Sequence, residues 1–83
     1  MKKELKEKDY FKSSDICLVS ALSTFGYQIE SIDTQNKSRA VFSIENDKKL
    51  DGLIHQYFTH KLRVEPLSFF NALKEIKTRL YHT

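Results

Sequence analysis

The sequence predicts an α+β fold in which a small antiparallel sheet, centred on a β-hairpin, packs against about three helices. Segments 27–33 and 39–45 are short, rich in β-branched and aromatic residues, and joined by the polar run 34–38, as in a hairpin. Three other segments repeat their apolar residues at helical spacing. The expected order of elements is (β)-α-β-β-α-(β)-α.

The chain has 83 residues, which is enough for one domain. Residues 9–83 are expected to form this globular domain, and residues 1–8 a solvated lead-in. Apolar residues make up 40% of the sequence, ten residues are aromatic, and the 30% charged residues are interspersed among them. This composition is typical of a folded domain rather than a disordered chain.

The sequence favours a cytoplasmic protein. Cys17 is the only cysteine, so the chain cannot form an internal disulfide. No stretch of 18 apolar residues is present to span a membrane. The lysines at the start of the chain are not followed by the apolar core of a secretory signal, so we expect no membrane partner.

The first predicted helix covers residues 16–25 and follows a short strand at 10–12. Ser13 or Ser14 is the expected N-cap, with the charge of Asp15 favourably placed in the first turn. The same three residues are also able to bind an anion at the helix start, but capping alone explains them. Apolar residues cover more than half of the circumference of this helix, which predicts that the helix is largely buried.

Gly26 is the expected stop of the first helix, and the hairpin follows it. In the second hairpin strand Ala40, Phe42 and Ile44 share one face, because side chains alternate along a strand. That face is expected to pack against the helices.

Asn46 or Asp47 is expected to cap a second helix of about 12 residues. One side of this helix is apolar, with Leu50, Leu53, Ile54, Tyr57 and Phe58. Residues 61–65 alternate in polarity and predict a short edge strand. Pro66 then fits the first position of a final helix that runs to about residue 81.

The final helix carries two parallel rows of side chains at the same helical spacing. The core-facing row is Phe69, Leu73, Ile76 and Leu80. The second row places two aromatic rings around two lysines, and we call it the basic-aromatic ridge: Phe70, Lys74, Lys77 and Tyr81.

The basic-aromatic ridge has three interpretations. Its rings are able to stack on bases while its lysines neutralise phosphates. The ridge also suits a protein interface with an aromatic anchor and a charged rim. Alternatively, the rings widen the core-facing row and the lysine stems lie along its edge.

Basic residues outside the final helix extend the possible contact surface. Lys61 and Arg63 alternate with apolar residues, so both charges are expected to leave one face of the predicted strand. Lysines near the N-terminus, Lys2, Lys3, Lys6, Lys8 and Lys12, form either a basic arm or a solvated terminus. Net charge is +3, with +2 in residues 1–12, −2 in residues 13–60 and +3 in residues 61–83. This mild asymmetry suits an anionic partner, although solubility also explains it.

Catalytic and metal chemistry find no support in the sequence. His55 and His60 are five residues apart, which does not suit two metal ligands on one helix face, and His82 lies far from both. Cys17 falls at the margin of an apolar arc, so we expect a packed thiol rather than a nucleophile. Only two glycines are present, too few for a phosphate-binding glycine loop. We therefore expect no enzyme, no metal and no cofactor.

Residues 9–81 resemble a small domain-of-unknown-function family associated with bacterial, phage and mobile-element genomes. The resemblance is carried by Tyr10-Phe11-Lys12-Ser13-Ser14-Asp15, Phe25-Gly26, Arg39-Ala40-Val41-Phe42, Phe69-Phe70-Asn71-Ala72-Leu73-Lys74-Glu75-Ile76-Lys77 and Leu80-Tyr81. It implies a compact single-domain fold and a genome-associated role, and it assigns no catalytic or binding residue.

The sequence thus predicts a non-enzymatic binding module. The first hypothesis is contact with nucleic acid through the basic-aromatic ridge, aided by Lys61 and Arg63. The alternative is a protein–protein module or homodimer, acting as an adaptor or inhibitor, that uses the same ridge or an exposed sheet edge. A further option is a subunit that completes a partner's active site.

Overall fold

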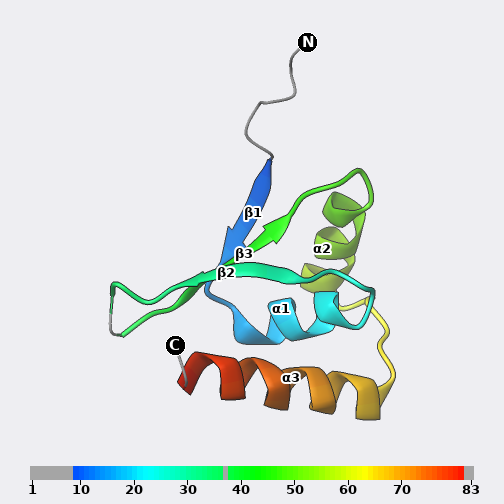
Figure 1. Cartoon of the computed structure of the whole chain (residues 1–83). Coiled ribbons are helices and arrows are strands. Elements are labelled where there is room, and N and C mark those ends of the chain that lie inside the picture. The colour runs from blue at the N-terminus through cyan, green and yellow to red at the C-terminus, as the bar shows by residue number, and fades with distance from the viewer. Residues whose placement is uncertain (1–8, 37, 82–83) are drawn as a thin grey trace.

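The computed structural model describes residues 9–36 and 38–81. The predicted lead-in 1–8, with Lys2, Lys3, Lys6 and Lys8, lies outside the described residues, as does His82. Six elements follow one another along the chain: β1 (Tyr10–Ser13), α1 (Ile16–Ser23), β2 (Ile29–Asp33), β3 (Val41–Glu45), α2 (Leu50–Phe58) and α3 (Pro66–Tyr81) (Figure 1). The predicted α+β class and its hairpin are confirmed.

The three strands form one antiparallel sheet in the order β1-β3-β2, with β3 in the centre. One face of the sheet is apolar and turned toward the helices. It carries Phe11, Ile29, Ile32, Phe42 and Ile44. Phe42 and Ile44 are buried, as their alternation along the strand predicts.

A bulge in β2 allows two isoleucines to reach the same face. Ile29 pairs with Ile44, but the next paired residue is Ser31, so Glu30 is an extra residue in β2. Side chains three residues apart in a regular strand point to opposite faces. The extra residue shifts that alternation, and Ile29 and Ile32 both pack against the core.

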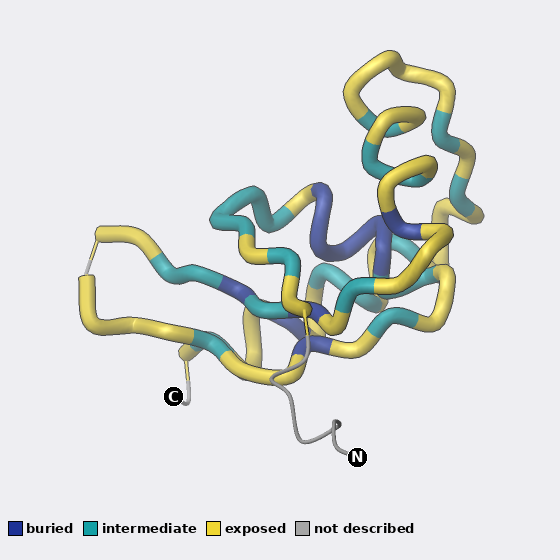
Figure 2. Tube along the Cα trace, turned by 90° about the horizontal axis from the view of Figure 1, so that it is seen from above, coloured by how far each residue is buried: buried dark blue, intermediate teal, exposed yellow. Residues whose placement is uncertain are grey.

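Helix α1 is the central helix of the domain. Five consecutive residues, 18–22, are buried, which confirms that the helix packs on more than one side. It lies between the sheet and α3 (Figure 1). The buried positions gather where the sheet, α1 and the start of α2 meet (Figure 2). The core side chains are Leu18, Val19, Leu22, Ile29, Phe42, Ile44, Leu50 and Ile76.

The N-cap of α1 is Asp15 rather than either predicted serine. One carboxylate oxygen of Asp15 accepts hydrogen bonds from the N–H groups of Cys17 (3.0 Å) and Leu18 (3.1 Å). Ser13 instead turns the chain before the helix, because its hydroxyl accepts the N–H of Asp15 at 3.0 Å. The Tyr57 hydroxyl also donates to Asp15, at 3.1 Å, so the cap of α1 is joined to α2.

Helix α2 is shorter than predicted, because the chain turns once before the helix begins. The N-cap of α2 is Lys49, so the predicted cap at Asn46 or Asp47 is wrong. Asp47 instead holds the turn before the helix, because its carboxylate accepts the N–H groups of Lys49 and Leu50 at 3.0 and 3.1 Å. The helix has nine residues.

The strand predicted at 61–65 does not form. The N–H groups of Lys61 and Leu62 both donate to the carbonyl of Gln56, at 2.8 and 3.1 Å. These groups therefore complete the end of α2 and are not available to a sheet. The segment forms the connection between α2 and α3.

Two helices end in the same type of turn, in which one residue adopts a left-handed conformation. In α1 that residue is Gly26 (φ 97°), and in α2 it is His60 (φ 66°). The matching hydrogen bonds are Tyr27 N–H to Leu22 at 3.4 Å and Lys61 N–H to Gln56 at 2.8 Å. Gly26 thus acts as the predicted stop, whereas His60 adopts a conformation that is costly for a residue with a Cβ.

His60→Gly is expected to stabilise the protein by about 0.5–1 kcal/mol, because glycine adopts positive φ without steric strain. Gly26→Ala is the matched opposite change and should destabilise by a similar amount, since no atom lies within 4 Å of the added Cβ and only backbone strain remains. Urea unfolding of both variants measures the two effects. Equal destabilisation by both changes would contradict this account.

Candidate interaction surface

Helix α3 begins at Pro66, as predicted, and Glu65 caps it. The Glu65 carboxylate accepts the N–H of Ser68 at 2.7 Å and the N–H of Leu67 at 3.2 Å. These hydrogen bonds lower the pKa of Glu65, because they favour its ionised form. The cap fixes where the helix starts and hence which side chains face outward.

The predicted core-facing row of α3 packs inward. Ile76 is buried, and Phe69, Leu73 and Leu80 are half-buried. This row sets the rotation of α3 about its axis. The adjacent row is therefore turned by about 100°, the angle between successive residues of a helix.

All four members of the basic-aromatic ridge are exposed. Phe70 is 54% exposed and Tyr81 is 78% exposed. Lys74 and Lys77 lie between them and are exposed as well. The two rings therefore do not widen the core of the domain.

Lys74 and Phe70 contact each other one helical turn apart. The ammonium nitrogen of Lys74 lies 5.3 Å from the centre of the Phe70 ring. Such a cation–π contact at an exposed site contributes about 0.5–1 kcal/mol. It also brings a positive charge and an aromatic ring to the same point on the surface.

Leu67 extends the basic-aromatic ridge toward the start of α3 and was missed at the sequence level. It is three residues before Phe70, which places it on the same side of the helix. Its side chain is 63% exposed. Helical spacing indicates this position, because Leu67, Phe70 and Lys74 stand at i, i+3 and i+7.

Lys61 and Arg63 lie in the connection before α3, and both are exposed. Leu62 and Val64 between them are half-buried, so the predicted alternation holds although the strand is absent. From Pro66 to Tyr81 the helix rises about 22 Å at 1.5 Å per residue. Lys61 and Arg63 therefore flank one end of the ridge and are far from Tyr81 at the other.

Charge is segregated within the described residues. Residues 61–81 contain five basic and two acidic residues. The remaining described residues, 9–36 and 38–60, contain four basic and seven acidic residues. The region around α3 is therefore positive, while the rest of the described fold is negative by the same amount.

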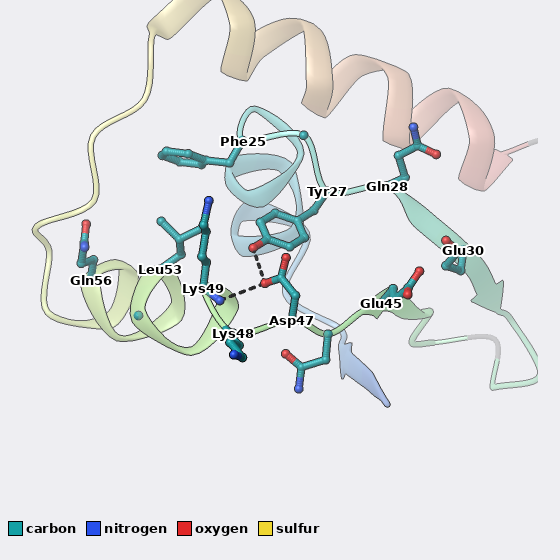
Figure 3. Close-up of a pocket in the computed structure, with 13 residues that line it drawn as sticks. Phe25, Tyr27, Gln28, Glu30, Glu45, Asp47, Lys48, Lys49, Leu53 and Gln56 are labelled. Carbon is teal, nitrogen blue, oxygen red and sulfur yellow. Dashed lines mark hydrogen bonds between the residues drawn. The ribbon is translucent and has the colours of Figure 1, made fainter. Parts of the chain in front are cut away.

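A surface pocket of about 780 Å³ lies elsewhere, between the turn after α1 and the start of α2 (Figure 3). The Tyr27 hydroxyl donates to the Asp47 carboxylate at 2.7 Å, and this contact crosses the pocket. Burial and the hydrogen bond to Asp47 raise the pKa of Tyr27 to about 12. The same hydrogen bond, with those from Lys49 and Leu50, lowers the pKa of Asp47. The contact joins the turn to α2, and we assign no ligand to the pocket.

A smaller cavity of about 360 Å³ is lined by Cys17, Tyr57, His60 and apolar side chains. The expectation of a packed thiol is wrong, because Cys17 is exposed at the first turn of α1. Burial, followed by hydrogen bonds to Cys17 and Asp15, raises the pKa of the Tyr57 hydroxyl. The tyrosine is thus held as a neutral donor between two helices.

Within residues 9–36 and 38–81, no cluster of three or more His, Cys, Asp or Glu side chains is placed to hold a metal ion. None of the helices in the described part of the chain has both the length and the hydropathy to cross a membrane.

The model of one protein family, described as Domain of unknown function (DUF5659), matches residues 8–82. No curated protein matches the chain, and no solved structure matches it.

Proposed function

The chain belongs to the DUF5659 family of domains of unknown function, and from its own geometry we propose a non-enzymatic module that binds single-stranded nucleic acid. The contact is the basic-aromatic ridge of α3. We place this activity in the cytoplasm of a bacterium or in a phage-infected cell, in keeping with a genome-associated role.

The observation that carries this proposal is the joint exposure of two rings and two lysines in one row. Phe70 and Tyr81 present aromatic faces on which bases stack, and stacking contributes about 1–3 kcal/mol per base. Lys74 and Lys77 lie between the rings, where they meet the phosphates that link stacked bases. Stacking accepts any base, so the binding should be tolerant of sequence.

The charge around the ridge supports the same partner. Lys61 and Arg63 flank the start of α3 and add two positive charges at that end. The acidic residues of the described fold lie mostly outside α3. A phosphate backbone is thus attracted to the α3 side and repelled by the rest of the molecule.

The test is a fluorescence-anisotropy titration of the full chain with labelled single-stranded and duplex oligonucleotides of about 16 nucleotides. We expect a Kd below about 0.1 mM at low salt for the single strand. Two to four phosphate contacts predict that log Kobs falls with log salt concentration with a slope of about −1.4 to −2.8. Weaker binding than this, or affinity independent of salt, would remove the proposal.

A protein partner is the second candidate, and the exposure of Leu67 favours it. Leu67 and Phe70 form an apolar pair at the start of α3, and exposed apolar anchors with a charged rim are typical of protein interfaces. In that case Leu67→Ala weakens binding more than loss of either lysine does. For nucleic acid the order is reversed. A pull-down with and without nuclease treatment, using the wild type, Leu67→Ala and a variant that lacks one ridge lysine, separates the two candidates.

A further inference from the structure

The two outer strands of the sheet differ in how their free edges are protected. Edge strands expose unpaired N–H and C=O groups, and proteins usually block them with bulges, charges or covering side chains. In the described part of the chain, β1 and β2 are both edge strands. The edge of β2 is interrupted by a bulge and covered by a side chain of α3, whereas the edge of β1 carries one charged residue, Lys12.

The free edge of β2 is interrupted by the bulge at Glu30. It is also covered from α3, because the Arg79 guanidinium donates to the carbonyl of Ile29 at 3.4 Å. An added strand cannot pair regularly with this edge.

The free edge of β1 is regular, and the hydrogen-bond phase shows which residues face it. The N–H of Asn46 donates to the carbonyl of Asp9 at 2.9 Å, so Asp9 faces β3. Residues facing a neighbouring strand alternate along the chain, so Phe11 and Ser13 face β3 as well. The N–H and C=O groups of Tyr10 and Lys12 are therefore directed to the outer edge, where no strand from residues 9–36 and 38–81 pairs with them.

We propose that this edge pairs with the β1 strand of a second copy of the chain, antiparallel, about a twofold axis at Phe11. Tyr10 of each copy is then directly opposite Lys12 of the other. These are the residues whose backbone groups face outward, so each Tyr10–Lys12 pair exchanges two backbone hydrogen bonds. The contact joins two sheets of three strands into one of six strands.

The side chains of β1 fit this register on both faces. The two Phe11 rings meet on the core side, where each is only partly buried in the single chain. On the outer face each Lys12 ammonium lies beside the ring of a Tyr10, which is 42% exposed in the single chain. The strand is thus complementary to itself.

Two neighbouring registers of the same strand pair are unfavourable. The strand therefore selects the pairing about Phe11 with a second copy. An axis at Lys12 places two lysines directly opposite each other. An axis between residues 11 and 12 places Phe11 opposite Lys12, on the same face of the joined sheet, and mixes apolar core with charge. Of these three registers, only the axis at Phe11 satisfies the backbone and both faces.

The contact is small, so we expect a weak dimer with a Kd on the order of 10–100 μM. Sedimentation velocity of the full chain between about 5 and 500 μM should show the mass rising toward twice that of one chain. Lys12→Pro removes an outward-facing N–H without removing a bond to β3, so it should keep the chain monomeric with an unchanged circular dichroism spectrum. Tyr81→Ala on α3 is the control and should dimerise as wild type does.

Disulfide trapping in a Cys17→Ser background tests the register. Phe11→Cys should cross-link, because directly opposite residues have Cα atoms about 4.5 Å apart. Lys12→Cys should not, because two Lys12 residues are offset along the strands and lie beyond about 7 Å. A strict monomer at the highest concentration, or faster cross-linking through Lys12→Cys, would overturn the proposal. The outcome is independent of nucleic-acid binding, because β1 and α3 share no residue.

Discussion

Phe42→Ala is expected to destabilise the domain by about 3–5 kcal/mol, the largest effect of any single change considered. Phe42 is 2% exposed in the central strand β3. Removing its ring leaves a cavity among side chains of the sheet and the helices. A chain of this length has about 4–12 kcal/mol of total stability, so the variant should be partly or wholly unfolded at 37 °C.

Circular dichroism during urea unfolding measures this effect. Phe58→Ala is the matched control, since the same ring is removed from a side chain that is 61% exposed. Phe58 packs edge-on against Tyr57 with centroids 5.0 Å apart, and such a pair contributes about 0.5–1.5 kcal/mol. If the Phe58 variant loses as much stability as the Phe42 variant, the assignment of the core is wrong.

Reversal of both ridge lysines, Lys74→Glu with Lys77→Glu, is expected to weaken nucleic-acid binding at least 100-fold at low salt, by about 3 kcal/mol or more. Each change removes a phosphate contact and adds a negative charge that repels the backbone. Both side chains are exposed, so folding should be little affected. Anisotropy titration and thermal unfolding measure the two quantities on one preparation.

Lys48→Glu with Lys49→Glu is the matched control for net charge. These lysines are also adjacent to a helix and exposed, but they precede α2 and border the pocket that contains Tyr27. If the contact is at α3, Lys48→Glu with Lys49→Glu reduces affinity only through long-range electrostatic repulsion, by less than about tenfold. An equal loss from both pairs would show that affinity follows net charge rather than the ridge.

Local sequence patterns predicted most of the fold because the responsible interactions are local. The alternation of Phe42 and Ile44, the helical spacing in α3 and the stop at Gly26 all reappear in the structure. Spacing also placed the second row of α3 beside the core-facing row, but it left open whether the two rings of that row are exposed. These features depend on side-chain periodicity and backbone strain, both of which can be read from neighbouring residues.

The errors arose where contacts outside the local pattern decide the structure. Residues 61–65 alternate like a strand, but the N–H groups of Lys61 and Leu62 complete the end of α2. A segment without a neighbouring strand has no sheet to join. The bulge at Glu30 depends on the packing of Ile29 and Ile32 against the helices. Asp15 caps α1 and also accepts a hydrogen bond from Tyr57, which is 42 residues away. The residues next to Asp15 in the sequence do not indicate that contact.

Only part of the candidate site was predicted, because only part of it depends on local spacing. Spacing along α3 was sufficient to place the basic-aromatic ridge in one row, and it extends to Leu67. The relation of Lys61 and Arg63 to that row depends on the turn at His60. A left-handed histidine is not evident from sequence, because glycine is the usual residue at such a position.

The position of the contact surface is best tested by amide chemical-shift mapping of the 15N-labelled chain during titration with a single-stranded oligonucleotide. We expect the largest shifts along α3, from Leu67 to Tyr81, with smaller ones at Lys61 and Arg63. Perturbations confined to the sheet or to the pocket beside Tyr27, or an unchanged spectrum at millimolar oligonucleotide, would contradict the assignment of α3 as the binding surface.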